Sequence, residues 1–71
     1  MSAAPASSKD LDALKKWLHD VNNRVGVILT TAELLQLETL SPQADARRRA
    51  IEDKAVEVRD LLREISTHYF S

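Results

Sequence analysis

Apolar residues recur along most of the chain at alternating spacings of three and four positions. The series in the first half consists of Leu11, Leu14, Leu18, Val21, Val25, Ile28, Ala32 and Leu35. The series in the second half consists of Ile51, Ala55, Val58, Leu62, Ile65 and Tyr69. This spacing is typical of helices that pack against other helices along a heptad seam. The pattern therefore predicts two long amphipathic α-helices.

Capping signals indicate where each helix begins. Ser7 and Asp10 have the three-residue spacing of a capping box, in which the two side chains accept hydrogen bonds from backbone amides of the first turn. Ser41 can cap a second helix with Pro42 at its first position, where proline loses no hydrogen bond. The chain is accordingly divided into a leader expected to be disordered and one helical unit over 8–71. The expected segments are the leader 1–7, a helix over about 8–39, a turn at 40–42 and a helix over about 42–69.

A turn this short makes the two helices antiparallel. Further apolar residues widen both stripes beyond two positions per heptad, which suits a helix with more than one neighbour. These flanking residues are Trp17, Leu29, Leu34, Ala50 and Leu61. We expect Trp17 to pack in the core or at its rim. A lone hairpin is expected to leave part of the seam exposed, namely Leu14, Val21, Val25, Ile28, Val58 and Ile65.

The small size of the chain favours self-association. A chain of 71 residues without cysteine has no disulfide, and so short a chain rarely builds a sufficient core alone. The predicted fold class is therefore all-α, an antiparallel two-helix hairpin that dimerises into a four-helix bundle.

Composition excludes several classes of function. Ten Lys and Arg against eleven Asp and Glu give a net charge of −1, unlike the basic excess of a nucleic-acid-binding protein. No apolar run reaches about 18 residues, and residues 1–8 lack the features of a secretory signal. We therefore expect a cytoplasmic location, with neither nucleic-acid binding nor direct membrane insertion.

The same composition bears on ligands. One glycine is too few for the phosphate-binding loops of nucleotide sites. His19 and His68 lie too far apart for a compact two-histidine metal motif. We expect no cofactor and no metal to be bound by this chain.

Candidate chemistry lies off the seam, on the first helix. His19 follows a seam residue, with Asp20 next to it and Asn23 four positions on. Gly26 and Thr30 continue the same line and make it polar, small and open, as a docking partner or a phosphoryl group would require.

The residue types in this group suit phosphoryl transfer. A neutral imidazole carries an unprotonated nitrogen nucleophile near neutral pH. Asp20 is positioned to accept a hydrogen bond from the other ring nitrogen, which would fix the tautomer and raise the basicity of the nucleophile. Asn23 can orient a water molecule or a phosphoryl oxygen one turn away.

The stretch H-D-V-N-N-R-V-G-V-I-L-T-T-A-E-L-L, from His19 to Leu35, resembles the H-box of sensor histidine kinases of the H-D-x-N-N subgroup. The resemblance implies a dimerisation and histidine-phosphotransfer domain. It implies that His19 takes a phosphoryl group from ATP and passes it to an aspartate of a response-regulator receiver domain. In that family the residue that matches Asp20 assists the imidazole, and the residue that matches Asn23 serves receiver dephosphorylation. One departure is Arg24, where many members have proline or an apolar residue.

The resemblance also implies partners. ATP and Mg belong to a separate kinase domain, because the Asn- and Gly-rich boxes of the nucleotide-binding domain are missing from this sequence. The expected partners are a second copy of the chain, the kinase ATP-binding domain and a receiver domain. The chain is expected to be either an excised domain or a free-standing phosphotransfer protein, and whether it is itself an enzyme stays open.

Alternatives remain at several points. A structural or adaptor coiled coil without chemistry would show the same heptads, and a monomeric histidine-phosphotransfer bundle is a weaker third class. The run Arg47, Arg48 and Arg49 is interpreted as a solvated face in preference to a partner contact. Arg59 and Arg63 are expected to lie level with His19, where they either assist a phosphate or balance Asp20.

Overall fold

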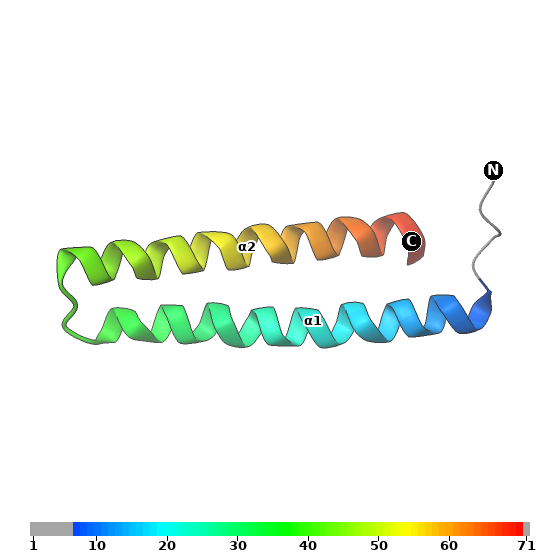
Figure 1. The fold of residues 1–71 in the computed structure, drawn as a ribbon, viewed down its shortest axis with the longest axis horizontal. Coiled ribbons are helices and arrows are strands. Elements are labelled where there is room, and N and C mark those ends of the chain that lie inside the picture. The colour runs from blue at the N-terminus through cyan, green and yellow to red at the C-terminus, as the bar shows by residue number, and fades with distance from the viewer. Residues whose placement is uncertain (1–6, 71) are drawn as a thin grey trace.

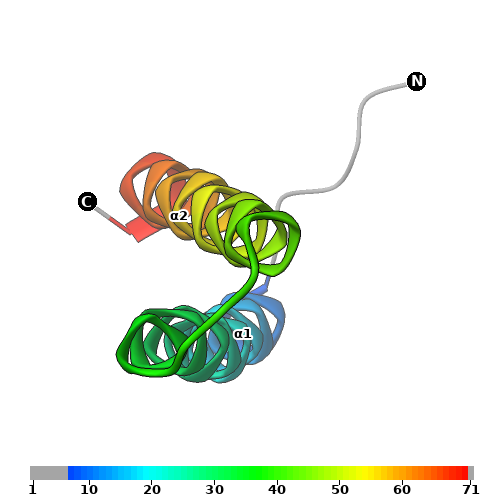
Figure 2. The same ribbon diagram turned by 90° about the vertical axis from the view of Figure 1, so that its left-hand side faces the viewer.

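The computed structural model describes residues 7–70, so the predicted disordered leader 1–7 lies outside the described residues except for Ser7. The described chain is an all-α hairpin (Figure 1). Its elements are α1 (Ser8–Leu34), the short 3₁₀ helix η1 (Leu35–Leu37) and α2 (Pro42–Phe70). The two long helices run antiparallel and lie side by side, as Figures 1 and 2 show from two directions. The molecule measures 53 × 22 × 18 Å.

Both helices begin where the capping residues predict. The backbone N–H of Asp10 donates to Ser7 Oγ at 3.1 Å, and the backbone N–H of Ser7 donates to Asp10 Oδ2 at 3.4 Å, which confirms the capping box. At the second helix, the backbone N–H of Ala44 donates to Ser41 Oγ at 3.1 Å. Pro42 is the first residue of α2.

The first helix ends earlier than the sequence predicts. α1 stops at Leu34 rather than near residue 39, and the chain tightens into η1 before Glu38 takes an extended conformation. The backbone N–H of Glu38 donates to the carbonyl of Leu35 at 3.1 Å and closes this turn. The chain must then cross to the second helix, and the residue before Pro42 is kept out of the helical region. The sequence does not indicate this helix end, because the apolar pattern continues through Leu34, Leu35 and Leu37.

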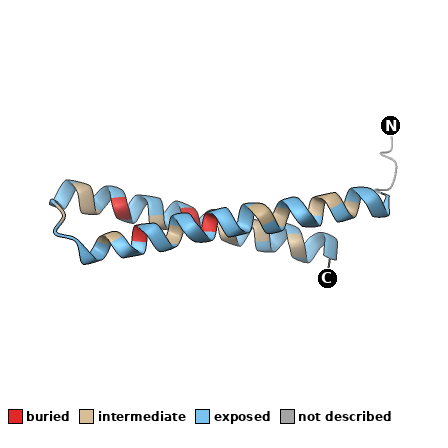
Figure 3. Ribbon diagram, turned by 90° about the horizontal axis from the view of Figure 1, so that it is seen from below, coloured by how far each residue is buried: buried red, intermediate tan, exposed pale blue. Residues whose placement is uncertain are grey.

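The core between the helices is narrow. Its buried apolar residues are Val25, Ala32 and Ala55 (Figure 3). The expectation that Val25 would be partly exposed in a lone hairpin is wrong, because its side chain is only 7% exposed. The other predicted members of this set lie open at Val21, Ile28, Val58 and Ile65, while Leu14 is half-buried. Two helices touch along one line, so only part of each predicted seam is covered.

Arg48 is the fourth buried residue, at 6% exposed. Its Nε donates to Asp45 Oδ1 at 3.0 Å, and one terminal nitrogen donates to Glu52 Oε2 at 2.6 Å. The hydrogen bond from Arg48 lowers the pKa of Asp45. The interpretation of residues 47–49 as a solvated face is therefore wrong for Arg48. It lies seven positions before Ala55, and its aliphatic stem packs where periodicity expects an apolar residue.

We expect Arg48→Ala to lower the melting temperature measured by circular dichroism, while Arg47→Ala leaves it unchanged. Arg48 supplies buried packing and two carboxylate contacts, whereas Arg47 is exposed and has no ion pair with a described residue. Because the folded-state pKa of Asp45 is lowered, the stabilisation of that carboxylate is present above its ordinary pKa, about 3.9. It is lost as the pH falls through the lowered value. The difference between the two variants should shrink in the same pH range, and equal melting temperatures at neutral pH would contradict this account.

Candidate functional site

His19 lies on α1 with an exposed imidazole. Its Nε2 is 3.3 Å from the side-chain nitrogen of Asn23, one helical turn further on. An amide N–H is a donor, so it pairs with the tautomer that carries its hydrogen on Nδ1 and the lone pair on Nε2. In that tautomer the nucleophilic lone pair is the one on Nε2, which the Asn23 amide occupies, and the contact that the four-residue spacing predicts is formed.

Asp20 does not contact the imidazole. Its Oδ2 pairs with Lys16 Nζ at 3.1 Å, and its backbone carbonyl accepts a hydrogen bond from Arg24 at 3.2 Å. The expected contact between the Asp20 carboxylate and the ring is absent because adjacent helical residues point about 100° apart and do not face each other. Asp20 therefore lies beside His19 in sequence but belongs to a separate charged cluster in space.

Gly26 and Thr30 are both exposed on α1. A Cβ built on Gly26 would meet no atom within 4 Å, and its φ is not positive. Close packing of the helices within the hairpin therefore does not require a glycine at this position. This open space is consistent with the sequence-based expectation that the line through Gly26 leaves room for a docking partner.

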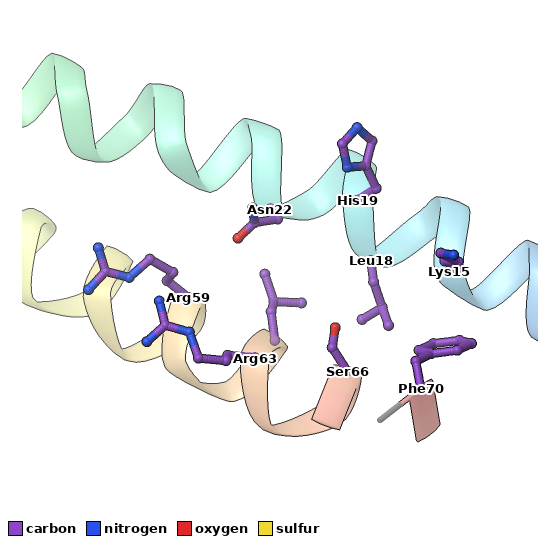
Figure 4. A pocket seen from close by; sticks show the side chains of 9 residues that line it. Lys15, Leu18, His19, Asn22, Arg59, Arg63, Ser66 and Phe70 are labelled. Carbon is purple, nitrogen blue, oxygen red and sulfur yellow. The ribbon is translucent and has the colours of Figure 1, made fainter. Parts of the chain in front are cut away.

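His19 borders a groove of about 450 Å³ between the two helices (Figure 4). Leu18, Leu62 and Phe70 form its apolar part. The polar lining residues are Lys15, His19 and Asn22 from α1, and Arg59, Arg63 and Ser66 from α2. In Figure 4 the imidazole is turned away from α2, whereas the side chains of Arg59 and Arg63 extend toward α1.

The sequence analysis predicts that Arg59 and Arg63 lie at the same height along the hairpin as His19. All three residues line this groove, which confirms the prediction. Sequence reasoning missed Lys15, Asn22 and Ser66. Lys15 and Asn22 stand four before and three after His19, and this spacing places them on the same helix face. That signal was present in the sequence. The position of Ser66 depends on how the two helices are paired.

A second hollow, of about 410 Å³, lies on a different side of the hairpin. It is lined almost entirely by apolar residues and by Lys54, and it shares no residue with the His19 groove. The apolar lining residues are Val25, Ile28, Ala50, Ile51, Ala55 and Val58. Ile28 comes nine residues after His19, which is about 180° around the helix. His19 therefore lies away from the apolar side.

Exposed apolar residues extend this apolar side along the hairpin. The apolar face comprises Trp17, Val21, Ile28, Ile51, Val58, Ile65 and Tyr69. Trp17, predicted to pack in the core or at its rim, is 61% exposed in the single hairpin. Helical rotation explains this position, because Trp17 is one residue out of register with the buried line through Leu18 and Val25.

The rest of the described chain offers few other sites. His68 packs edge-on against Tyr69, with ring centroids 4.8 Å apart. Within residues 7–70 no group of three or more His, Cys, Asp or Glu side chains could hold a metal ion. In the same range neither helix is long and apolar enough to cross a membrane.

Comparisons with known proteins assign no family. No family model matches the chain, and no significant match is found among curated proteins or solved structures.

Proposed function

We propose that this chain is a histidine-phosphotransfer hairpin of two-component signalling. His19 accepts a phosphoryl group from the ATP-binding domain of a kinase and passes it to an aspartate of a response-regulator receiver domain. The observation that carries the proposal is the exposed imidazole whose Nε2 faces the Asn23 amide at 3.3 Å, on a side of the helix away from the apolar face. The resemblance of residues 19–35 to the H-box supports the same assignment.

The chemistry needs little beyond a positioned nucleophile. The Nε2 lone pair attacks the γ-phosphorus of ATP, a nitrogen–phosphorus bond forms, and the bond to the ADP oxygen breaks. In the second step a carboxylate oxygen of the receiver attacks the same phosphorus, and the nitrogen–phosphorus bond breaks. Both steps depend mainly on positioning and on charge stabilisation. For the first step the hydrogen bond from the Asn23 amide to Nε2 must open, so that the lone pair is free to attack. In a later step the same amide can orient a water molecule that hydrolyses the acyl phosphate of the receiver.

We further propose that two copies of the hairpin form a four-helix bundle through the apolar face. A small domain rarely reaches more than about 3–5 kcal/mol from its own core, and this hairpin buries only three apolar side chains among the described residues. Covering a few hundred square ångströms of the apolar face at about 25 cal/mol per Å² is comparable to the stability of a small domain. Because His19 lies away from this face, the dimer leaves the imidazole open.

Gly26 and Thr30 are proposed as part of the receiver-docking surface. They lie about two and three turns beyond His19 on the same open line, and no side chain of the described hairpin covers Gly26. Glycine lowers helix stability by about 1 kcal/mol relative to alanine. The need for space for a docked receiver domain would explain why a glycine is used here.

The proposal is tested by incubating the chain with a phosphorylated receiver domain or a histidine-kinase ATP-binding domain. We expect a phosphoryl label that is labile in acid and stable in base, the behaviour of phosphohistidine. His19→Gln should abolish the label without changing helix content or oligomeric state. His68→Gln is the matched control and should label as the unaltered chain does; equal labelling of His19→Gln would refute the assignment.

The alternative is an adaptor hairpin that dimerises and performs no chemistry. The exposed apolar face supports this reading as well as it supports the dimer of a phosphotransfer domain. An adaptor would show dimerisation with no labelling by any phosphodonor, so the same experiment separates the two.

A further inference from the structure

The groove beside His19 collects positive charge in a chain whose net charge is −1. Lys15 comes from α1, and Arg59 and Arg63 come from α2. No Asp or Glu is among the residues that line the groove. Arg59 and Arg63 are four residues apart on one helix, a spacing at which like charges repel each other. The fold thus holds three cations together without a carboxylate between them.

These three side chains are poorly paired compared with other cations of the hairpin. Lys16, Arg48, Arg49 and Lys54 each have a carboxylate oxygen at 2.6–3.1 Å. Within the described chain Lys15 and Arg63 make no ion pair or hydrogen bond. The contact of Arg59 with a carboxylate is the loose one of 3.8 Å between its Nε and Asp60 Oδ1.

The Nε of Arg59 is buried and has no hydrogen-bond partner among the described residues. A buried donor without a partner is costly, and an ordered water or a ligand oxygen can satisfy it. Asn22 and Ser66 add neutral hydrogen-bonding groups from opposite walls of the groove. Guanidinium forks with nearby amide and hydroxyl groups match the geometry of phosphate oxygens.

We propose that Lys15, Arg59 and Arg63 form a non-covalent site for a phosphate-class dianion, with Asn22 and Ser66 as neutral partners. The imidazole of His19 lies at the rim of this site, turned away from α2 (Figure 4). The site needs no covalent step, and it stands on the groove itself rather than on the phosphotransfer function. If His19 does carry a phosphoryl group, the same cations lie beside it.

The test is a titration of the ¹⁵N-labelled chain with inorganic phosphate, followed by NMR at constant ionic strength. We expect saturable shifts at backbone amides of residues 15–22 and 59–66 and at the Nε–H groups of Arg59 and Arg63. Chloride at the same ionic strength should give neither saturation nor this pattern. Shifts that grow linearly with either anion, or that spread over the whole surface, would overturn the site.

Variants decide which side chains bind. Arg63→Gln should weaken phosphate binding about tenfold, the typical effect of losing one charged hydrogen bond, and Arg63→Lys should retain part of the affinity. Arg47→Gln removes an exposed arginine near the turn, far from the groove, and should leave binding unchanged. Equal weakening by Arg47→Gln and Arg63→Gln would show only a general charge effect. Arg59 is half-buried, so Arg59→Gln could disturb the fold. Its phosphate affinity is therefore compared only if its helix content matches that of the unaltered chain. If it does not match, Arg63→Gln alone decides whether the arginines bind phosphate.

The phosphate titration and the phosphohistidine-labelling assay, both made on the unaltered chain, separate this site from the proposed function, because the imidazole is turned away from the arginines. Phosphate binding without any phosphohistidine labelling would refute the phosphotransfer function and leave the anion site in place. Labelling at His19 without saturable phosphate binding would refute the anion site alone.

Discussion

Val58→Asp is expected to abolish the dimer and to lower helix content at micromolar concentrations. Val58 is 40% exposed in the single hairpin and lies on the apolar face with Ile28 and Ile51. A dimer would bury the new carboxylate without a sufficient partner, at a cost of several kcal/mol. The proposed dimer links folding to association, so the melting temperature of the unaltered chain should rise with protein concentration, and that dependence should vanish in the variant. Light scattering after size exclusion and circular dichroism measure the two effects.

Val27→Asp is the matched control. Val27 is 66% exposed on α1 and does not line the apolar hollow. Each of the two valines has a cation one turn before it, Lys54 for Val58 and Arg24 for Val27, so the new carboxylates have similar local partners. Val27→Asp should therefore keep the mass and the concentration dependence of the unaltered chain. A monomer mass with a concentration-independent melt for the unaltered chain would contradict the four-helix bundle.

Val25→Asp tests a different contact. Val25 is buried between α1 and α2 within one hairpin, so aspartate there should unfold the hairpin itself.

The fluorescence of Trp17, the one tryptophan of the chain, reports on the apolar face. Its emission should shift to the blue on dimerisation in the unaltered chain and in Val27→Asp, and it should stay red-shifted in Val58→Asp.

Asp20 and Asn23 are expected to affect different reactions. Asp20→Asn should slow phosphorylation of His19 by a kinase domain by about 100-fold, the lower end of a general-base or orienting effect. In the single hairpin Asp20 pairs with Lys16 and does not contact the imidazole, so its action on His19 requires the docked kinase domain to rearrange both side chains. Asp12→Asn, an exposed carboxylate two turns earlier on the same helix, is the control and should not change the rate.

Asn23→Ala should slow dephosphorylation of the receiver and leave labelling of His19 nearly intact. The amide of Asn23 is next to Nε2, where a docked acyl phosphate and its attacking water would lie. The Gln43→Ala variant removes a surface amide near the turn and serves as the control. Similar losses in labelling and in dephosphorylation from both Asp20→Asn and Asn23→Ala would show that the two roles are not divided between these residues.

Periodicity and capping residues were sufficient to predict the hairpin, because long helices with clear caps depend on local sequence. The pattern predicts too long a first helix, because Leu34, Leu35 and Leu37 continue the apolar spacing through a turn that the crossing to Pro42 determines. The heptad pattern predicts that a lone hairpin leaves part of the seam exposed, but it puts Val25 in the exposed set, whereas in the hairpin Val25 is buried and the open apolar face lies beside it. Periodicity cannot tell these apart, because it does not show how two helices rotate against each other.

The candidate site was predicted in part. The contact between His19 and Asn23 follows from four-residue helical spacing, so it could be read from the sequence. The Asp20 contact failed because sequence neighbours do not face each other on a helix, and Lys16 is better placed for its carboxylate. The groove with Arg59 and Arg63 depends on helix pairing, which the sequence could suggest only through an antiparallel turn.

The central claim is that His19 is the phosphoacceptor, and the most direct test is to locate the phosphoryl group in the phosphorylated chain. The account predicts a single acid-labile phosphoryl group that peptide mass spectrometry places on His19 and that ³¹P NMR assigns to Nε2, the nitrogen that faces Asn23. A phosphoryl group on His68, an acid-stable group on a serine or threonine, or no group after exposure to competent donors would contradict it.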